Sequence, residues 1–157
     1  MRNKFLTPEI LERIKSDQIV PYTLSVEVLI NDDNIKRFSL PNNETLRDKI
    51  IIGLFVRGQN TAGNRVSKSG YTLISNSSLA CAHLTLEQNN MRFLNEFPLD
   101  FLLFENRQGK YFELITCGFD PTNSYVAFSA SDSASRLVNQ EVVELNFVYI
   151  DPQDYKD

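Results

Sequence analysis

Apolar side chains recur at every second position along much of this chain. The clearest run lies near the N-terminus, where Tyr22, Leu24, Val26, Val28 and Ile30 alternate with residues that are mostly polar. Successive side chains of a strand point to opposite faces of a sheet, so a period of two predicts a half-buried antiparallel strand. A chain built from such runs is expected to fold into β-sheets.

Short apolar or alternating runs continue between turn signals through the rest of the sequence. Residues 31–34 are Asn, Asp, Asp and Asn, which favour a turn, and we expect them to join the first two strands as a hairpin. Residues 49–57 are almost continuously apolar, as in a strand covered on both faces. We expect eight to ten strands in all, drawn from residues 22–30, 35–40, 49–57, 71–75, 79–87, 91–97, 99–104, 111–117, 124–129 and 141–150.

No helix-length segment separates these expected strands. That order favours a β-sandwich or a barrel over a fold in which strands and helices alternate. The long loop expected at residues 58–70 is tolerated at one end of a jelly roll. The predicted fold class is all-β: a single antiparallel β-sandwich, jelly-roll-like, with a short N-terminal amphipathic helix.

The helix is predicted from its start signal. Thr7 can cap it, Pro8 loses no hydrogen bond in the first turn, and Glu9 lies beside the positive end of the helix dipole. We expect a helix over about residues 8–16 that docks on its own domain, the alternative being a neighbouring subunit. The expected organisation is an N-terminal arm at 1–18, a sandwich domain at 19–151 and a polar tail at 152–157.

Length and charge restrict the classes of protein that fit. A chain of 157 residues is long enough for one domain with a real core. The net charge is −4 and the 16 basic residues are scattered, so nucleic acid is not expected as the main partner. The longest apolar run, residues 50–56, is too short to span a bilayer, and no secretory signal is visible. We therefore expect no transmembrane segment, and synthesis in the host cytoplasm.

Residues that suggest catalysis or ligand binding have simpler interpretations. His83 is the only histidine, and Cys81 lies two positions before it, too far along a strand for good proton transfer. Residues 58–63 have the glycine spacing of a phosphate-binding loop, but Asn64 and Arg65 stand where that loop needs Lys and then Ser or Thr. We expect a structural histidine and a surface loop.

Metal sites and disulfides are not expected either. Cys81 and Cys117 are interpreted as small buried side chains without a bridge between them. The acids of one turn and of the tail lack the spacing of a calcium-binding loop; they are Asp32, Asp33, Asp151, Asp154 and Asp157. The prediction is a protein that is not an enzyme and has no cofactor and no metal.

What remains for function is the surface. The candidate interaction loop runs from 58 to 70, and the residues selected in and beside it are Arg57, Asn64, Arg65, Lys68 and Tyr71. A second feature is an aromatic stretch, which is core in the simplest interpretation. Any part of it that the domain cannot bury would mark a subunit interface. Its members are Phe93, Phe97, Phe101 and Phe104.

Three segments, residues 84–86, 93–99 and 119–128, resemble small virion proteins of tailless icosahedral phages that infect Bacteroidetes-type bacteria. The resemblance covers roughly residues 45 to 130 and lies in apolar spacing, the Pro98-Leu99 pair and the segment from Asp120 to Tyr125. It implies a β-sandwich capsid or vertex subunit that assembles with copies of itself and with other capsid proteins. It assigns no functional residue.

Three hypotheses for function follow, in decreasing order of support. The first is a structural virion protein, a minor capsid or vertex subunit of penton type, located in the virion and acting by self-assembly and by contact with other capsid or surface proteins. The alternative is a host-recognition or carbohydrate-binding β-sandwich module whose loops bind glycans. An enzyme that uses carboxylates is the third, and no residue pattern supports it.

Overall fold

The chain is mostly β. The computed structural model describes residues 6–59, 65–129 and 140–155. The all-β prediction is confirmed for this part. The strands are β1 (Tyr22–Leu29), β2 (Arg37–Ser39), β3 (Ile50–Arg57), β4 (Thr72–Leu73), β5 (Ala82–Gln88), β6 (Met91–Pro98), β7 (Phe112–Thr116), β8 (Tyr125–Phe128) and β9 (Glu141–Ile150).

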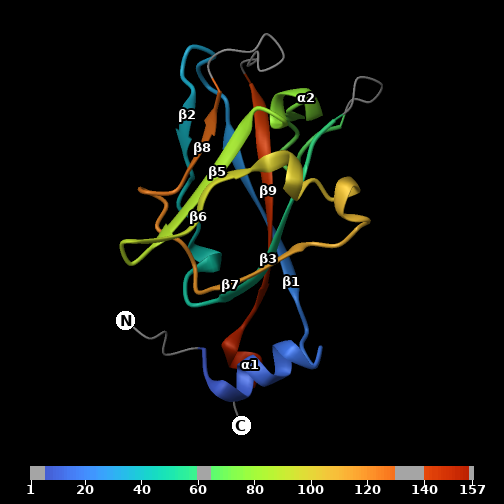
Figure 1. The fold of residues 1–157 in the computed structure, drawn as a ribbon, viewed down its shortest axis with the longest axis vertical. Helices are drawn as coiled ribbons and strands as arrows, with labels where there is room; N and C mark the ends of the chain where they lie inside the picture. Colours follow the sequence, from blue (N-terminus) through green and yellow to red (C-terminus); the bar gives the residue numbers. More distant parts are fainter. Residues whose placement is uncertain (1–5, 60–64, 130–139, 156–157) are drawn as a thin grey trace.

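The helices are short and lie between or beyond the strands. The α-helices are α1 (Pro8–Lys15) and α2 (Asn76–Leu79), and the 3-10 helices are η1 (Glu44–Leu46), η2 (Leu99–Leu102), η3 (Glu105–Arg107) and η5 (Pro152–Tyr155). Figure 1 shows α1 at one end of the molecule, beyond the ends of β1 and β9.

Two sheets form the body of the molecule. The first has the order β1-β9-β3-β7, and β4 adds to it by pairing in parallel with β9. The second has the order β2-β8-β5-β6. All the other strand pairs are antiparallel. β1 and β7 are therefore edges of the first sheet, and β2 and β6 are edges of the second.

With β4 left aside, the strands pair as in one long hairpin that has been folded over. β5 pairs with β6, β3 with β7, β2 with β8 and β1 with β9. These pairs alternate between the sheets. The pairing of β9 with β3 completes the first sheet, and the pairing of β8 with β5 completes the second. β1 and β9 are thus neighbours although more than a hundred residues separate them in the sequence.

Apolar side chains from both sheets meet in one core. Val26 and Phe147 come from the first sheet, and Leu84 and Val126 come from the second. Each is at most 2% exposed, and burial of a side chain of this size contributes about 1.5–3 kcal/mol. Burial alternates along the second half of β1, which explains why the period of two was visible there in the sequence.

Helix α1 packs on the outer face of the first sheet. Thr7 caps it by accepting a hydrogen bond from the backbone N–H of Ile10. Ile10 is buried in a second cluster with Ile50, Ile52, Val148 and Ile150. The helix therefore docks on its own domain, as expected, and it explains why β3 is apolar on both faces.

The predicted hairpin at residues 22–40 is wrong. β1 pairs along its whole length with β9, and β2 pairs with β8 in the other sheet. Asp32 does form the expected turn, accepting a hydrogen bond from the N–H of Asn34. The turn carries the chain from one sheet to the other, because Val28 and Phe38 reach the same core from opposite sides.

Two other expected strands are partly helical. Residues 99–104 begin with η2, in which Leu99 and Leu102 are both fully buried at a spacing of three. The expected strand at 79–87 begins only at Ala82, because residues 76–79 form α2. β2 and β4 are also shorter than the expected strands at 35–40 and 71–75.

The expected polar tail starts with an ordered turn. Residues 152–155 form η5, and Tyr155 packs against the cluster beneath α1. The Tyr155 hydroxyl accepts a hydrogen bond from the N–H of Val20, and the Tyr22 hydroxyl donates to Asp154. These contacts close the same end of the sheet that α1 covers.

Candidate functional site

A row of charged side chains crosses the outer face of the first sheet. Glu144 on β9 lies directly opposite Arg57 on β3 and Glu27 on β1. Arg57 donates from Nε to Oε1 of Glu144 at 2.5 Å and from Nη2 to Oε2 at 2.8 Å. The hydrogen bond to Glu144 raises the pKa of the Arg57 guanidinium above its ordinary value. The Arg57 guanidinium is therefore bound to Glu144 of the same chain.

Polar contacts continue from this pair along the sheet. The Asn146 amide donates to Oε1 of Glu144 at 3.0 Å, and the Ser25 hydroxyl donates to Oδ1 of Asn146 at 2.6 Å. A buried carboxylate requires such partners, because an unpaired charge away from water is costly. Glu144 accepts hydrogen bonds from both Arg57 and Asn146, so we interpret this network as structural.

Glu27 connects the same row to the candidate interaction loop. Its Oε1 accepts a hydrogen bond from the N–H of Ser69 at 3.3 Å. Burial would raise the pKa of Glu27, but hydrogen bonds from Ser67 and Ser69 outweigh burial, and the pKa lies below the ordinary value. The described part of the loop is thus held against the sheet.

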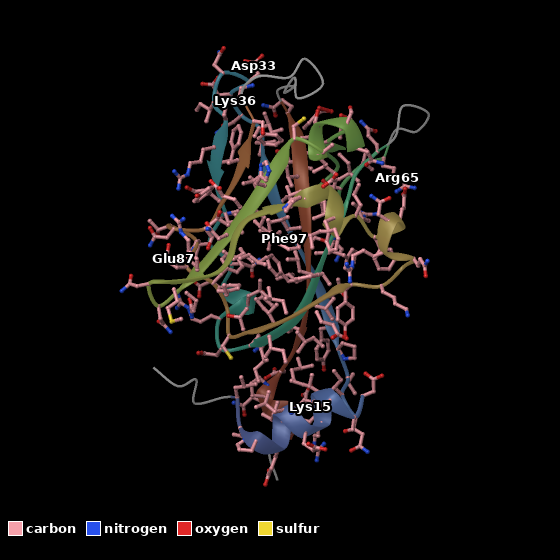
Figure 2. The ribbon with its side chains drawn as sticks, viewed as in Figure 1. Lys15, Asp33, Lys36, Arg65, Glu87 and Phe97 are labelled. Atoms are coloured by element: carbon pink, nitrogen blue, oxygen red, sulfur yellow. The ribbon has the colours of Figure 1, made fainter. Side chains whose placement is uncertain are left out.

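Two of the residues predicted for the interaction loop pair with different acids. Arg57 is paired with Glu144, whereas Arg65 forms a separate, exposed ion pair with Glu105 of η3, at 2.6 Å. Lys68 and Tyr71 are exposed, and Asn64 lies outside the described residues. Figure 2 places Arg65 at the outer margin of the molecule.

The structure also places His83 and the glycine-containing segment that begins at Gly58. His83 lies on β5 between Pro98 and Ala127, and its side chain makes no hydrogen bond within the described residues. Gly58 packs against α2, where a Cβ would overlap the side chains of Asn76 and Leu79, which accounts for this glycine without a phosphate. Within residues 6–59, 65–129 and 140–155, no three acids, cysteines or histidines gather as a metal site would require.

A groove of about 530 Å³ opens where η2 and η3 lead from β6 to β7. Phe101 is 54% exposed here, because η2 turns its neighbours Leu99 and Leu102 into the core. Gln108, with a positive φ of 57°, and Gly109 turn the chain back after η3. The polar, charged and aromatic side chains that line the groove are Asp100, Phe101, Asn106, Arg107, Gln108 and Lys110.

Arg107 is held against aromatic rings. Its guanidinium carbon lies 5.4 Å from the ring centroid of Phe101 and 5.3 Å from that of Phe112. Its Nε is buried with no hydrogen-bond partner among the residues that the structure describes. Neither Arg107 nor Lys110 belongs to the ion pairs of the described residues. Buried polar atoms normally have partners, and among the described residues Arg107 Nε and Asn76 Oδ1 are the two that lack one.

The aromatic stretch divides between core and groove. Phe93 and Phe97 pack on the main core, and Phe104 lies against Phe55 at 4.6 Å between ring centroids. Phe97 also contacts Phe101 and Phe112, at 5.5 and 5.0 Å. Phe97 lies near the centre of the view in Figure 2. Only Phe101 of the four is largely exposed, and Arg107 beside it was missed from the sequence.

Comparison of the chain with family models, with curated proteins and with solved structures gave no match. None of the helices in the described ranges has the length and apolar character needed to cross a bilayer.

Proposed function

We propose that this chain is a structural virion protein, a minor capsid or vertex subunit built as a jelly-roll β-sandwich. The folded-over hairpin carries this proposal. A jelly roll has eight antiparallel strands in two sheets, in which the first strand pairs with the last and the second with the second-last, until the two middle strands pair with each other. The pairs from β1 with β9 to β5 with β6 follow this order. Viral capsid subunits and lectin domains are built on this architecture.

The packed interior supports a role that uses the surface. Ile51, Leu84 and Phe147 have no exposed area and fill the space between the sheets. Recognition therefore has to use the outer faces, the edges and the loops. A subunit that works by assembly needs no more than these.

The sheet edges on one side offer apolar contacts. Ile115 on the edge strand β7 is 44% exposed, and Met91 on the edge strand β6 is 73% exposed. Gln88, the partner of Met91, donates to the carbonyl of Cys117 just after β7, which ties these two edges together. An unpaired edge is a template for another chain, and symmetric assembly provides a partner for it.

The oligomeric state of the purified chain tests this role. We expect native mass spectrometry and light scattering to detect oligomers that grow with concentration, alone or with capsid proteins encoded beside this one. The double variant Met91→Lys/Ile115→Lys should shift the protein to monomer. Ile35→Lys is the matched control, because Ile35 is also 44% exposed but lies in the β1–β2 connection.

A chain that remains monomeric in both settings would contradict the proposal. So would oligomers that the edge variant leaves unchanged and the Ile35→Lys control abolishes.

A further inference from the structure

We infer that the groove beside η2 and η3 binds an acidic saccharide, a sugar unit that carries a carboxylate, such as a uronic acid. This binding activity goes beyond assembly and does not depend on it. It rests on the shape of the groove, on one exposed ring and on two cations that form no ion pair with any described residue.

The dimensions and lining suit a small polar ligand. Ligand sites commonly have volumes of about 300–1,000 Å³ and combine apolar surface with a few polar groups that fix orientation. The groove, at about 530 Å³, lies within that range. Its wall joins an aromatic ring to amides, a carboxylate and cations within residues 100–110.

Phe101 provides a flat apolar surface. It is 54% exposed, yet its ring is held by edge contacts with Phe97 at 5.5 Å and Phe112 at 6.4 Å between centroids. The face of an aromatic ring carries partial negative charge. The C–H groups on one face of a pyranose are slightly positive and pack well on such a surface.

Arg107 and Lys110 provide the positive charge that a carboxylate needs. Arg107 is already oriented by the rings of Phe101 and Phe112, so little side-chain entropy is lost when it binds. Guanidinium and carboxylate groups form charge-assisted pairs that are among the stronger hydrogen bonds in proteins.

Asp100 restricts the ligand class further. Its carboxylate also lines the groove and makes no ion pair with Arg107 or Lys110. It would repel a compact anion such as phosphate, but it can accept hydrogen bonds from hydroxyl groups. Gln108 can both donate and accept. A ligand with hydroxyls beside one acid group satisfies all of these side chains.

Titration with two trisaccharides tests the inference. The probes are trigalacturonic acid and its neutral analogue galactotriose, followed by NMR and calorimetry on the full chain. We expect trigalacturonic acid to bind at least tenfold more tightly than galactotriose. Lys110→Gln should weaken its binding by roughly tenfold to a hundredfold through the loss of a charged hydrogen bond. Phe101→Ala should also weaken it, through the loss of the apolar surface on which the sugar packs.

The control variant is Lys68→Gln, which removes an exposed cation outside the groove. It should leave binding unchanged, and thermal unfolding of every variant should match that of the parent protein. Absence of binding at millimolar sugar, or equal binding of the two trisaccharides, would overturn the inference. A triglutamate peptide that binds through the same residues as tightly as trigalacturonic acid would also overturn it, in favour of an acidic protein partner.

Discussion

Arg57 and Glu144 face each other across β3 and β9 and form a two-point ion pair. Glu144 has no exposed surface, whereas the Arg57 side chain is 39% exposed. One partner is therefore accessible and the other depends on it. Removal of the arginine would leave a carboxylate buried without its main counter-charge.

We expect Arg57→Ala to lower the free energy of unfolding by about 3 kcal/mol, because truncation of one partner of a buried pair leaves an uncompensated charge. Urea denaturation followed by circular dichroism measures this loss. Arg57→Met/Glu144→Leu should recover much of it, since an apolar pair carries no unpaired charge.

The exposed pair between Arg65 and Glu105 is the natural control. Both side chains are about half exposed, so Arg65→Ala should cost less than about 1 kcal/mol. Equal losses for Arg57→Ala and Arg65→Ala would contradict the assignment of Glu144 as a buried, dependent carboxylate.

Glu27 should make the protein more stable above its own titration range. Its folded pKa lies below the ordinary value of 4.5, so its stabilising contribution is present above about pH 4.5 and is lost as the pH falls through the folded pKa. Glu27→Gln should therefore be less stable than the parent at pH 7, with the difference shrinking in acid. Urea midpoints measured from pH 7 to pH 3 check this. A deficit that is constant with pH would argue against a titrating role.

Glu141 should have the opposite effect. Burial raises its pKa above 4.5, so the folded state is favoured while the group is protonated and loses that advantage as the pH rises through the folded pKa. Glu141→Gln should be more stable than the parent at pH 7 and no more stable near pH 4. Thermal unfolding at the two pH values distinguishes this from a variant that is uniformly destabilised.

Gly53 is needed because the ring of Tyr111 lies where a side chain would begin. We expect Gly53→Ala to lower the free energy of unfolding by about 1–3 kcal/mol through overpacking of this contact. The Tyr111→Ala change should relieve the clash, so the double variant should lose less than the sum of the two single changes. Strict additivity would mean that the ring and the glycine are not coupled.

Elements with a strong local pattern were predictable from the sequence. The strand expected at 141–150 is β9, with the same bounds. Its nearly continuous burial reflects its position between β1 and β3, with the core on one face and α1 over part of the other. The capped helix was predictable for the same reason, because Thr7, Pro8 and Glu9 act within a single turn.

Strand partners and the groove were not predictable. Alternation along β1 indicates which side chains are buried but not that the partner strand is β9, more than a hundred residues away. The groove depends on η2, where Leu99 and Leu102 at a spacing of three turn inward and leave Phe101 outside. The contact of Arg107 with the Phe101 ring depends on that turn, so it was not visible in the sequence.

The presence of this chain in assembled particles is the most direct measure of the proposed role. Particles from cells that carry the gene would be separated on a density gradient and their proteins quantified by mass spectrometry. We expect the chain to sediment with the particles, in a fixed ratio to the other coat proteins, and to remain with them after a high-salt wash. A chain that stays in the soluble fraction while complete particles form without it would contradict the proposal.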